Sequence, residues 1–279
     1  MDNVIAFPVG GPPQAASGVV GLARLQPGAK PINHGNLNST YLAQLDVSAN
    51  DTVTAYIKDL SARELGNELL TSCLCEMAGA PTPRSFLVGA EPGLISAKKA
   101  PKAADGTLFL FGSEEVNAPS LRRTYNTAMH FVYEALRIKV SKWNGVGLLY
   151  GMDSWSANID RNIGNVLIQG DLVWLIDHEA CFTGRDWKSG DLIPDKKYDN
   201  KLKLWLTEVM DSGRRSEVAA EAVKFAEKLS AIDLNEAVKR SRADHFMSLP
   251  DVEALSLFLT ARASHIAALA EDALDLKAA

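Results

Sequence analysis

The sequence predicts an α+β protein with two lobes, a small strand-rich N-terminal lobe and a larger, mainly helical C-terminal lobe. Residues 18 to 112 hold short apolar runs of strand character around a single helical pattern, whereas residues 113 to 279 are mainly helical in periodicity. The 279 residues are enough for one large core or two closely joined lobes. Residues 1 to 17, rich in Gly, Pro and Ala, are expected to form a flexible N-terminal arm.

The small lobe is expected to begin with strands. Residues Val19 to Leu25, Tyr41 to Val47 and Val53 to Lys58 are apolar-rich or partly alternating. Between the first two, Pro27 to Asn38 contains Pro, Gly, His and Asn, which is typical of a connection. The sequence SANDT before Val53 predicts a turn.

One helix is expected after these strands. Ser61 is a candidate N-cap, and Glu64 three residues later completes the pattern of a capping box. Apolar residues then recur at i+4 spacing, which places them on one helix face: Leu65, Leu69, Cys73 and Met77. The helix is expected to end near Gly79, before Pro81.

The rest of the chain changes from strands to helices. Strands are predicted in SFLVG, GLISAK (Gly93 to Lys98) and TLFLFG, up to a hinge after Phe111. Helices are predicted over Leu121 to Lys142 and Val146 to Ser156, followed by the short strands NVLIQ and LVWLI. Residues 200 to 279 predict several amphipathic helices, the last near Asp251 to Leu276.

Composition limits the functional classes. The 29 basic and 34 acidic residues give a net charge of −5, which argues against broad nucleic-acid or membrane-surface binding. No apolar stretch is long enough to span a bilayer, and the N-terminus lacks the pattern of a signal peptide. The three cysteines, without zinc-site spacing, are expected to be reduced thiols of a cytoplasmic protein.

The segment Asp153 to Phe182 carries the most chemistry. It holds a polar loop from Asp160 to Asn165, the two short strands, and then Asp177. Phosphoryl transfer needs a carboxylate near the acceptor hydroxyl and oxygen ligands for Mg²⁺. Asp160 suits the first role, and Asn165 and Asp177 suit the second. The alternative is a solvated loop before an ordinary hairpin, since Asp, Asn and Gly are common turn residues.

This segment resembles the catalytic and metal-binding loops of HipA-like kinases, which share the protein-kinase-like and phosphatidylinositol-kinase-like folds. The family pattern Asn-x-Asp-Arg-His-x-x-Asn is matched by NIDRNIGN, and its Ile-Asp-His by LIDH within LIDHEACF. The resemblance implies a catalytic Asp160 and the metal ligands Asn165 and Asp177. Two residues depart from the pattern: Asn162 replaces the usual His, and Glu179 stands where a small residue is common. Weak activity or none therefore stays open, as does an altered metal preference.

The resemblance extends into the small lobe. It implies that Lys58 contacts phosphate oxygens and pairs with a helix glutamate, assigned to Glu68 because Asn67-Glu68-Leu69-Leu70 matches the family's run. Glu64 is the rival partner. The phosphate-facing loop is expected at Gly35, Asn36, Asn38, Ser39 and Thr40, and the adenine-facing strand at Leu110 and Gly112, where an apolar core is an equal alternative.

The implied activity is transfer of phosphate from ATP with Mg²⁺, or Mn²⁺, to Ser or Thr of a protein, with an antitoxin-like regulator as a candidate partner. The rivals are a kinase for a small molecule or lipid head group and a pseudokinase without turnover. The segment Thr183 to Asp199 predicts a mobile loop that suits a protein acceptor, or else a plain surface connection. It lacks a cluster of aromatic and acidic residues for a cationic metabolite. The basic run Lys196 to Lys203 and the pair Arg214-Arg215 are expected to be solvated.

Overall fold

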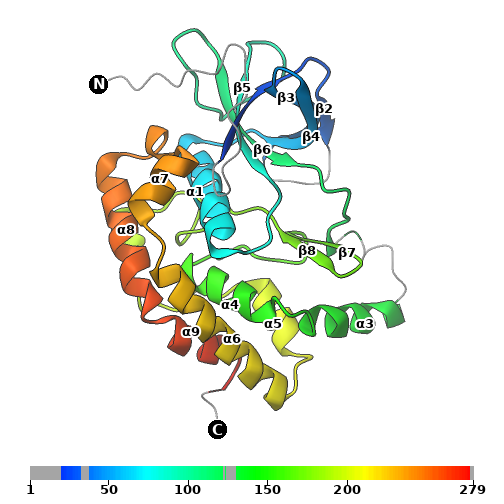
Figure 1. The fold of residues 1–279 in the computed structure, drawn as a ribbon, viewed down its shortest axis with the longest axis vertical. Coiled ribbons are helices and arrows are strands. Elements are labelled where there is room, and N and C mark those ends of the chain that lie inside the picture. The colour runs from blue at the N-terminus through cyan, green and yellow to red at the C-terminus, as the bar shows by residue number, and fades with distance from the viewer. Residues whose placement is uncertain (1–19, 33–37, 122, 124–129, 277–279) are drawn as a thin grey trace.

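A computed structural model describes residues 20–32, 38–121, 123 and 130–276. The upper part in Figure 1 is a strand-rich lobe with one helix against it. Its elements are β1 (Gly21–Leu25), β2 (Lys30–Ile32), β3 (Thr40–Ser48), β4 (Asp51–Lys58), α1 (Ala62–Ala78), β5 (Ser85–Ala90) and β6 (Leu108–Glu114).

The six strands form one sheet in the order β1-β5-β6-β4-β3-β2. The sheet curls, because β1 pairs in parallel with β5 and also antiparallel with the C-terminal half of β3. Alternation along the strands divides their side chains between two sides. One set, including Leu45, Ile57 and Leu110, packs together in a core within the curled sheet, and the other, including Phe109 and Phe111, packs with α1.

The larger lobe is mainly helical (Figure 1). Helix α4 is buried along almost its whole length and packs against α6, α8 and α9. The hairpin of β7 and β8 lies on the side of this lobe that faces the sheet. The elements are α3 (His130–Ser141), α4 (Val146–Trp155), β7 (Val166–Gln169), β8 (Leu172–Leu175), α5 (Lys201–Thr207), α6 (Ser212–Ser230), α7 (Leu234–Ser241), α8 (Leu249–Ala263), α9 (Ile266–Ala273) and the 3₁₀ helices η1 (Ser189–Asp191) and η2 (Ala243–His245).

Helix α1 is held by both lobes. It packs against β5 and β6 on one side and against α7 and η2 on another. Arg63 pairs with Asp251 of α8 at 2.7 Å, and Gly66 leaves room for the side chain of Met247. The C-terminal helices therefore fix the helix of the small lobe, which Figure 1 shows beside α7.

The local signals at the ends of α1 are confirmed. Ser61 and Glu64 form both hydrogen bonds of the capping box, and Gly79 ends the helix in the left-handed conformation at φ 76°. The predicted strands around it are present, with β3 and β4 somewhat longer than expected. The connection Pro27 to Asn38 contains the short strand β2, so that prediction was incomplete.

Two predicted elements were wrong. Gly93 to Lys98 forms turns and bends rather than a strand, and the backbone N–H groups of Lys98, Lys99 and Ala100 donate to the carboxylate of Asp59. The last helix is divided at Ser264 and His265 into α8 and α9, bent by 70°. The predicted helix over Leu121 to Lys142 is seen as α3; residues 122 and 124–129 lie outside the described residues.

The basic residues expected to be solvated are partly buried. Lys203 is 3% exposed, and its Nζ donates to Ser154 Oγ at 2.8 Å. Arg214 and Arg215 donate to backbone carbonyls of other elements, at 3.1 Å to Trp143 O and 3.0 Å to Thr207 O. These side chains therefore support the packing of the helices.

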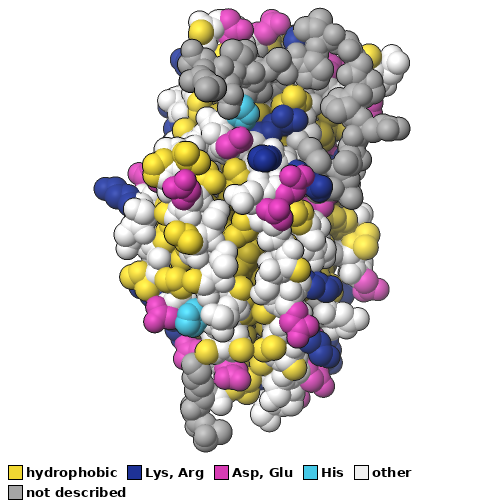
Figure 2. Space-filling model, turned by 60° about the vertical axis from the view of Figure 1, so that its left-hand side comes forward, with side chains coloured by type: hydrophobic (Ala, Val, Ile, Leu, Met, Phe, Trp, Pro, Cys, Tyr) yellow, Lys and Arg dark blue, Asp and Glu magenta, His cyan; other side chains and the backbone are white. Residues whose placement is uncertain are grey.

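The outer face around α7 and α8 mixes apolar side chains with charged groups of both signs (Figure 2). Leu249 and Leu257 of α8 are 70% and 73% exposed. Among the described residues, no single helix is long and apolar enough to cross a membrane, and α8 with α9 meets that test only as a bent pair.

Candidate active site

Strand β4 and helix α1 bring a lysine and a glutamate together. Lys58 ends β4, and its Nζ contacts Glu68 Oε1 directly. Glu68 is fully buried, and its other oxygen accepts the backbone N–H of His178. Glu64, one turn earlier, instead completes the helix cap and lies 3.3 Å from Lys99. The structure thus places Glu68, and not Glu64, against Lys58.

Asp177 reaches the same lysine from the larger lobe. It follows β8 and has a left-handed backbone, φ 65°, which turns the chain sharply at this point. Its Oδ1 lies 2.7 Å from Lys58 Nζ, and Glu179 Oε2 lies 3.7 Å from the same atom. Carboxylate oxygens of Glu68, Asp177 and Glu179 all lie within 4.8 Å of one another.

The loop that carries Asp160 is built on a buried arginine. Arg161 is 1% exposed; it pairs with Asp153 at 3.1 Å and donates to Ile176 O at 2.6 Å. This bond ties the loop to the strand end before Asp177. Asn165 O accepts the N–H of Ile176 at 3.1 Å, so Asn165 lies beside the same strand end.

Amide side chains hold the loop backbone around Asp160. Asn165 Nδ2 donates to Asp160 O at 3.0 Å, and Asn162 Nδ2 donates to the same oxygen at 2.7 Å. Asn162 Oδ1 accepts the Gly164 N–H at 2.8 Å. Asn162, which stands in place of the usual histidine, therefore braces the loop backbone through both of its polar atoms.

Glu179 connects the two lobes. It is 4% exposed, and its Oε1 accepts from Asn38 Nδ2 at 2.8 Å and from Arg185 Nε at 2.9 Å. The same guanidinium donates through Nη2 to Asp160 Oδ2 at 2.7 Å. Asn38 comes from the segment before β3, and its Oδ1 accepts from Lys99 at 2.6 Å. A continuous polar chain thus joins the small lobe to Asp160.

Burial and charge set the ionisation of this cluster. Burial alone would lower the pKa of Lys58, but the carboxylates of Asp177, Glu68 and Glu179 raise it above its usual value. Burial would likewise raise the pKa of Asp177, and the attraction of Lys58 lowers it instead. Burial raises the pKa of Glu68 to about 7 against the opposing pull of Lys58.

His178 stays neutral in this environment. Burial and the nearby cations Arg161 and Lys58 hold its pKa well below the usual value. Its Nδ1 lies 3.2 Å from Arg161 Nη2, so the ring contacts the buried arginine under the loop. Burial also raises the pKa of the Cys73 and Cys181 thiols to about 12, which disfavours the reactive thiolate form.

Some predicted nucleotide contacts are not brought to this cluster. Leu110 is fully buried in the core of the sheet, and a Cβ on Gly112 would lie 2.7 Å from Val88 Cγ2. Side chains alternate along β6, so Phe109 and Phe111 point towards α1 while Leu110 and Gly112 face the core within the sheet. This supports the alternative in which these two positions belong to an apolar core.

The expected phosphate-facing loop is described only at its end. Ser39 O accepts the N–H of Asp59 at 3.0 Å, and Thr40 begins β3 opposite Lys58. Asn38 is the member of this set that contacts Glu179. Gly35 and Asn36 lie outside the described residues.

The segment Thr183 to Asp199, predicted as a mobile loop, is packed against the larger lobe and α1. Trp187 is 3% exposed and donates to Asn67 Oδ1 at 2.9 Å, with Arg63 over its ring. Arg262 donates to the carbonyls of Pro194 and Lys196 at 2.7 and 2.9 Å. These long-range contacts explain why a sequence rich in Gly, Pro and charge is nevertheless held in place.

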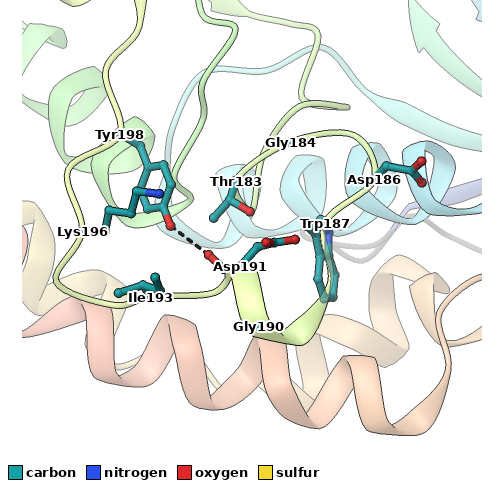
Figure 3. A pocket seen from close by; sticks show the side chains of 9 residues that line it. All are labelled: Thr183, Gly184, Asp186, Trp187, Gly190, Asp191, Ile193, Lys196 and Tyr198. Atoms are coloured by element: carbon teal, nitrogen blue, oxygen red, sulfur yellow. Dashed lines mark hydrogen bonds between the residues drawn. The ribbon is translucent and has the colours of Figure 1, made fainter.

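A cavity of about 380 Å³ opens within this segment, separate from the Lys58 cluster. Figure 3 shows Trp187 and Asp191 on one side and Tyr198 on the other, with the Tyr198 hydroxyl bonded to Asp191 O. Asp186 also lines it. Folding thus gathers aromatic and acidic residues that are spread along the sequence, together with Lys196, around one cavity.

Several contacting residues were not predicted. No short motif predicts the contacts of these residues, because each meets partners far along the chain or in another element. They are Arg185, Lys99, Asn67 and Asp153. Asn67 is the one among them that a sequence signal could have indicated, because it lies within the Asn-Glu-Leu-Leu run beside Glu68.

The residues present fit a bound nucleotide with a divalent metal. Carboxylate oxygens of Glu68, Asp177 and Glu179 lie within 4.8 Å of one another, and such hard oxygen ligands are the kind that Mg²⁺ prefers. Asn165 lies beside the strand end that precedes Asp177, where its backbone carbonyl accepts the Ile176 N–H. Lys58 adds a cation for phosphate oxygens at the same point. Asp160 stands on the neighbouring loop, with its carboxylate 2.7 Å from Arg185 Nη2.

No protein-family model matches the chain, and no curated protein matches its sequence. Among solved structures, the fold is similar to the Helicobacter pylori proinflammatory kinase CtkA, with a TM-score of 0.52. The sequences are 13% identical, and the match covers 84% of this chain and 95% of that one. The predicted α+β architecture, a strand-rich N-terminal sheet followed by a mostly helical part, is confirmed, and the chain has a protein-kinase-like fold.

Proposed function

We propose that this chain is an ATP- and Mg²⁺-dependent kinase of the HipA-like kind, which transfers phosphate to Ser or Thr of a protein. The observation that carries the proposal is the contact of Lys58 with both Glu68 and Asp177, next to the loop that holds Asp160. Phosphoryl transfer depends on positioning and on charge neutralisation, and this cluster offers both.

Each residue has a distinct part. Lys58 binds phosphate oxygens and is oriented by Glu68, which is itself anchored by the His178 N–H. Asn165 and Asp177 hold the metal, which when bound neutralises charge on the phosphates. Asp160 accepts the hydrogen bond, and then the proton, of the acceptor hydroxyl.

The first test is nucleotide binding. ATP with Mg²⁺ or Mn²⁺ should raise the free energy of unfolding by about 2.7 kcal/mol at 100 times its dissociation constant. ATP with EDTA should stabilise much less, and Asp177→Asn should lose the metal-dependent part. If millimolar ATP gave the same thermal unfolding curve with and without metal, the metal-dependent kinase would be ruled out.

The second test is transfer. Protein is incubated with labelled ATP and either a cell lysate or a metabolite pool. Label in a protein band that Asp160→Asn fails to label supports a protein acceptor. Metal-dependent binding without any transfer supports a pseudokinase.

A specific observation favours a small-molecule acceptor as the second candidate. The cavity at Asp186, Trp187, Asp191 and Tyr198 combines carboxylates with aromatic rings, and the buried hydroxyl of Thr183 at its wall has no hydrogen-bond partner among the described residues. Buried polar atoms usually have partners, so a polar ligand would complete the site. Label found only in small molecules, and lost in Asp191→Asn, decides for this candidate.

A further inference from the structure

The carboxylate of Asp160 has one side-chain partner among the hydrogen bonds and ion pairs of the described residues. Arg185 Nη2 lies 2.7 Å from Asp160 Oδ2. The other contacts of Asp160 involve its backbone: its N–H donates to Asn158 Oδ1, and its carbonyl accepts from Asn162 and Asn165. The motif around Asp160 thus fixes the backbone and leaves the carboxylate to a residue outside the motif.

Arg185 is itself fixed at two points. Its Nε donates to Glu179 Oε1 at 2.9 Å, and that same oxygen is held by Asn38. Its chain neighbour Gly184 is held by the buried side chain of Asn67, whose Nδ2 also donates to Glu179 O at 2.8 Å. Asn67 therefore ties both partners of this contact to helix α1.

We infer that Arg185 is the positioning residue for Asp160, with Glu179 as its anchor. One planar guanidinium spans two carboxylates through different nitrogens, a geometry that a lysine ammonium does not reproduce. Glu179, one of the two departures from the family pattern, thereby acquires a role: it directs Arg185, which directs Asp160. This inference rests on the proposed function, because it concerns the orientation of the carboxylate that meets the acceptor.

The test uses Arg185→Gln and Arg185→Lys. With labelled Mg²⁺-ATP, transfer to water is measured as release of labelled phosphate, and transfer to myelin basic protein is measured as label incorporated into that protein. Arg185→Gln should lower kcat by about 10- to 100-fold, since small misplacements of catalytic groups cost about that much. The KM for ATP and the thermal shift with Mg²⁺-ATP should stay as in wild type. Arg185→Lys should recover part of kcat. Arg240→Gln, which removes an exposed arginine–glutamate pair on α7, is the matched control.

A double variant separates positioning from a general structural role. If Arg185 acts through Asp160, adding Arg185→Gln to Asp160→Asn should lower kcat no further. Additive losses, an unchanged kcat in Arg185→Gln, or an equal loss of nucleotide binding would each overturn the inference.

A crystal structure of Arg185→Gln gives a readout that does not depend on turnover. The Asp160 carboxylate should turn away from its wild-type position; an unmoved carboxylate overturns the inference. If the wild-type protein transfers phosphate to neither probe, the proposed function fails for these acceptors, while this structure still decides whether Arg185 positions Asp160.

Discussion

The two sides of the candidate site are held by different forces. On the side of α1, Glu68 is fully buried, and the helix that carries it packs against both lobes. On the side of the loop that carries Asp160, the side chains of Asp160 and Arg185 are 39% and 30% exposed and meet through a polar contact. Apolar burial is non-directional and hard to rearrange, whereas an exposed polar pair exchanges readily with water.

Because of this difference, substitutions on the two sides should affect different properties of the protein. Changes near α1 leave buried charges unpaired or disturb packing, so their effects should be seen in the free energy of unfolding. Changes at the partly exposed side chains of Asp160 and Arg185 should affect the rate of transfer with little effect on stability. The C-terminal helices strengthen the contrast, because Arg63 with Asp251 and Gly66 with Met247 keep α1 in place.

The largest expected effect is on the loop side. Asp160→Asn should lower the rate of transfer by about 10²- to 10⁴-fold, the usual contribution of a positioned acid or base. Its free energy of unfolding should change by no more than about 0.5 kcal/mol, because the side chain is exposed. Urea unfolding and single-turnover transfer measure the two quantities. A loss of stability of several kcal/mol would break the proposed contrast.

On the α1 side, Lys58→Met should destabilise the fold by about 3–5 kcal/mol, because buried Glu68 would lose its cation. Urea unfolding measures this, and Lys58→Met combined with Glu68→Gln should recover part of the loss. The control is Lys139→Met, whose exposed amine lies 3.9 Å from Asp171. If Lys58→Met were as stable as the control, the Lys58 cation would not be needed to stabilise buried Glu68.

Lys203 is a buried lysine on α5, and its Nζ donates to Ser154 Oγ of α4, the helix that precedes the Asp160 loop. Burial lowers its pKa from 10.5 to about 8, so between these values the unfolded chain binds more protons than the folded one. Stability from this group therefore rises as pH increases from 8 to 10.5, by about 3 kcal/mol. Below pH 8 the lysine is charged in both states, and the cost of burying that charge is fully present.

The measurement is urea unfolding of wild type and Lys203→Met from pH 7 to 10.5. The free energy of unfolding of Lys203→Met, minus that of wild type, should change across this window. This difference should be smallest at high pH, where wild type no longer carries the buried charge. Lys201→Met, an exposed lysine on the same helix, should run parallel to wild type. A pH-independent difference between Lys203→Met and wild type would refute the lowered pKa.

The smallest effect concerns the contact of α1 with η2 and α8. A Cβ on Gly66 would lie 2.8 Å from Met247 Cε and 3.0 Å from its Cγ. Overpacking costs about 1–3 kcal/mol, and replacing a helical glycine by alanine returns about 1 kcal/mol, so Gly66→Ala should lose about 1 kcal/mol. Thermal unfolding checks this against Gly190→Ala, whose Cβ would contact nothing within 4 Å. Increased stability in Gly66→Ala would show that the contact is loose.

Local signals of a few residues determined much of this protein. Ser61 with Glu64 and then Gly79 set the ends of α1, because caps involve neighbours within one turn. The segment from Asp160 to Asp177 was predicted to hold a polar loop and two short strands, and the bond from the Ile176 N–H to Asn165 O joins the two ends of this hairpin. The two-lobed order of strands and helices followed from periodicity.

Contacts between distant segments were decided only by the tertiary structure. Asn38 and Glu179 are 141 residues apart, and Arg185 meets Asp160 across 25 residues, so no periodicity or motif encodes either pair. The burial of Lys203, the break between α8 and α9 and the inward direction of Leu110 depend on what packs against them. Sequence patterns indicate which kind of environment a segment needs, such as an apolar face. The tertiary structure determines which residues provide that environment.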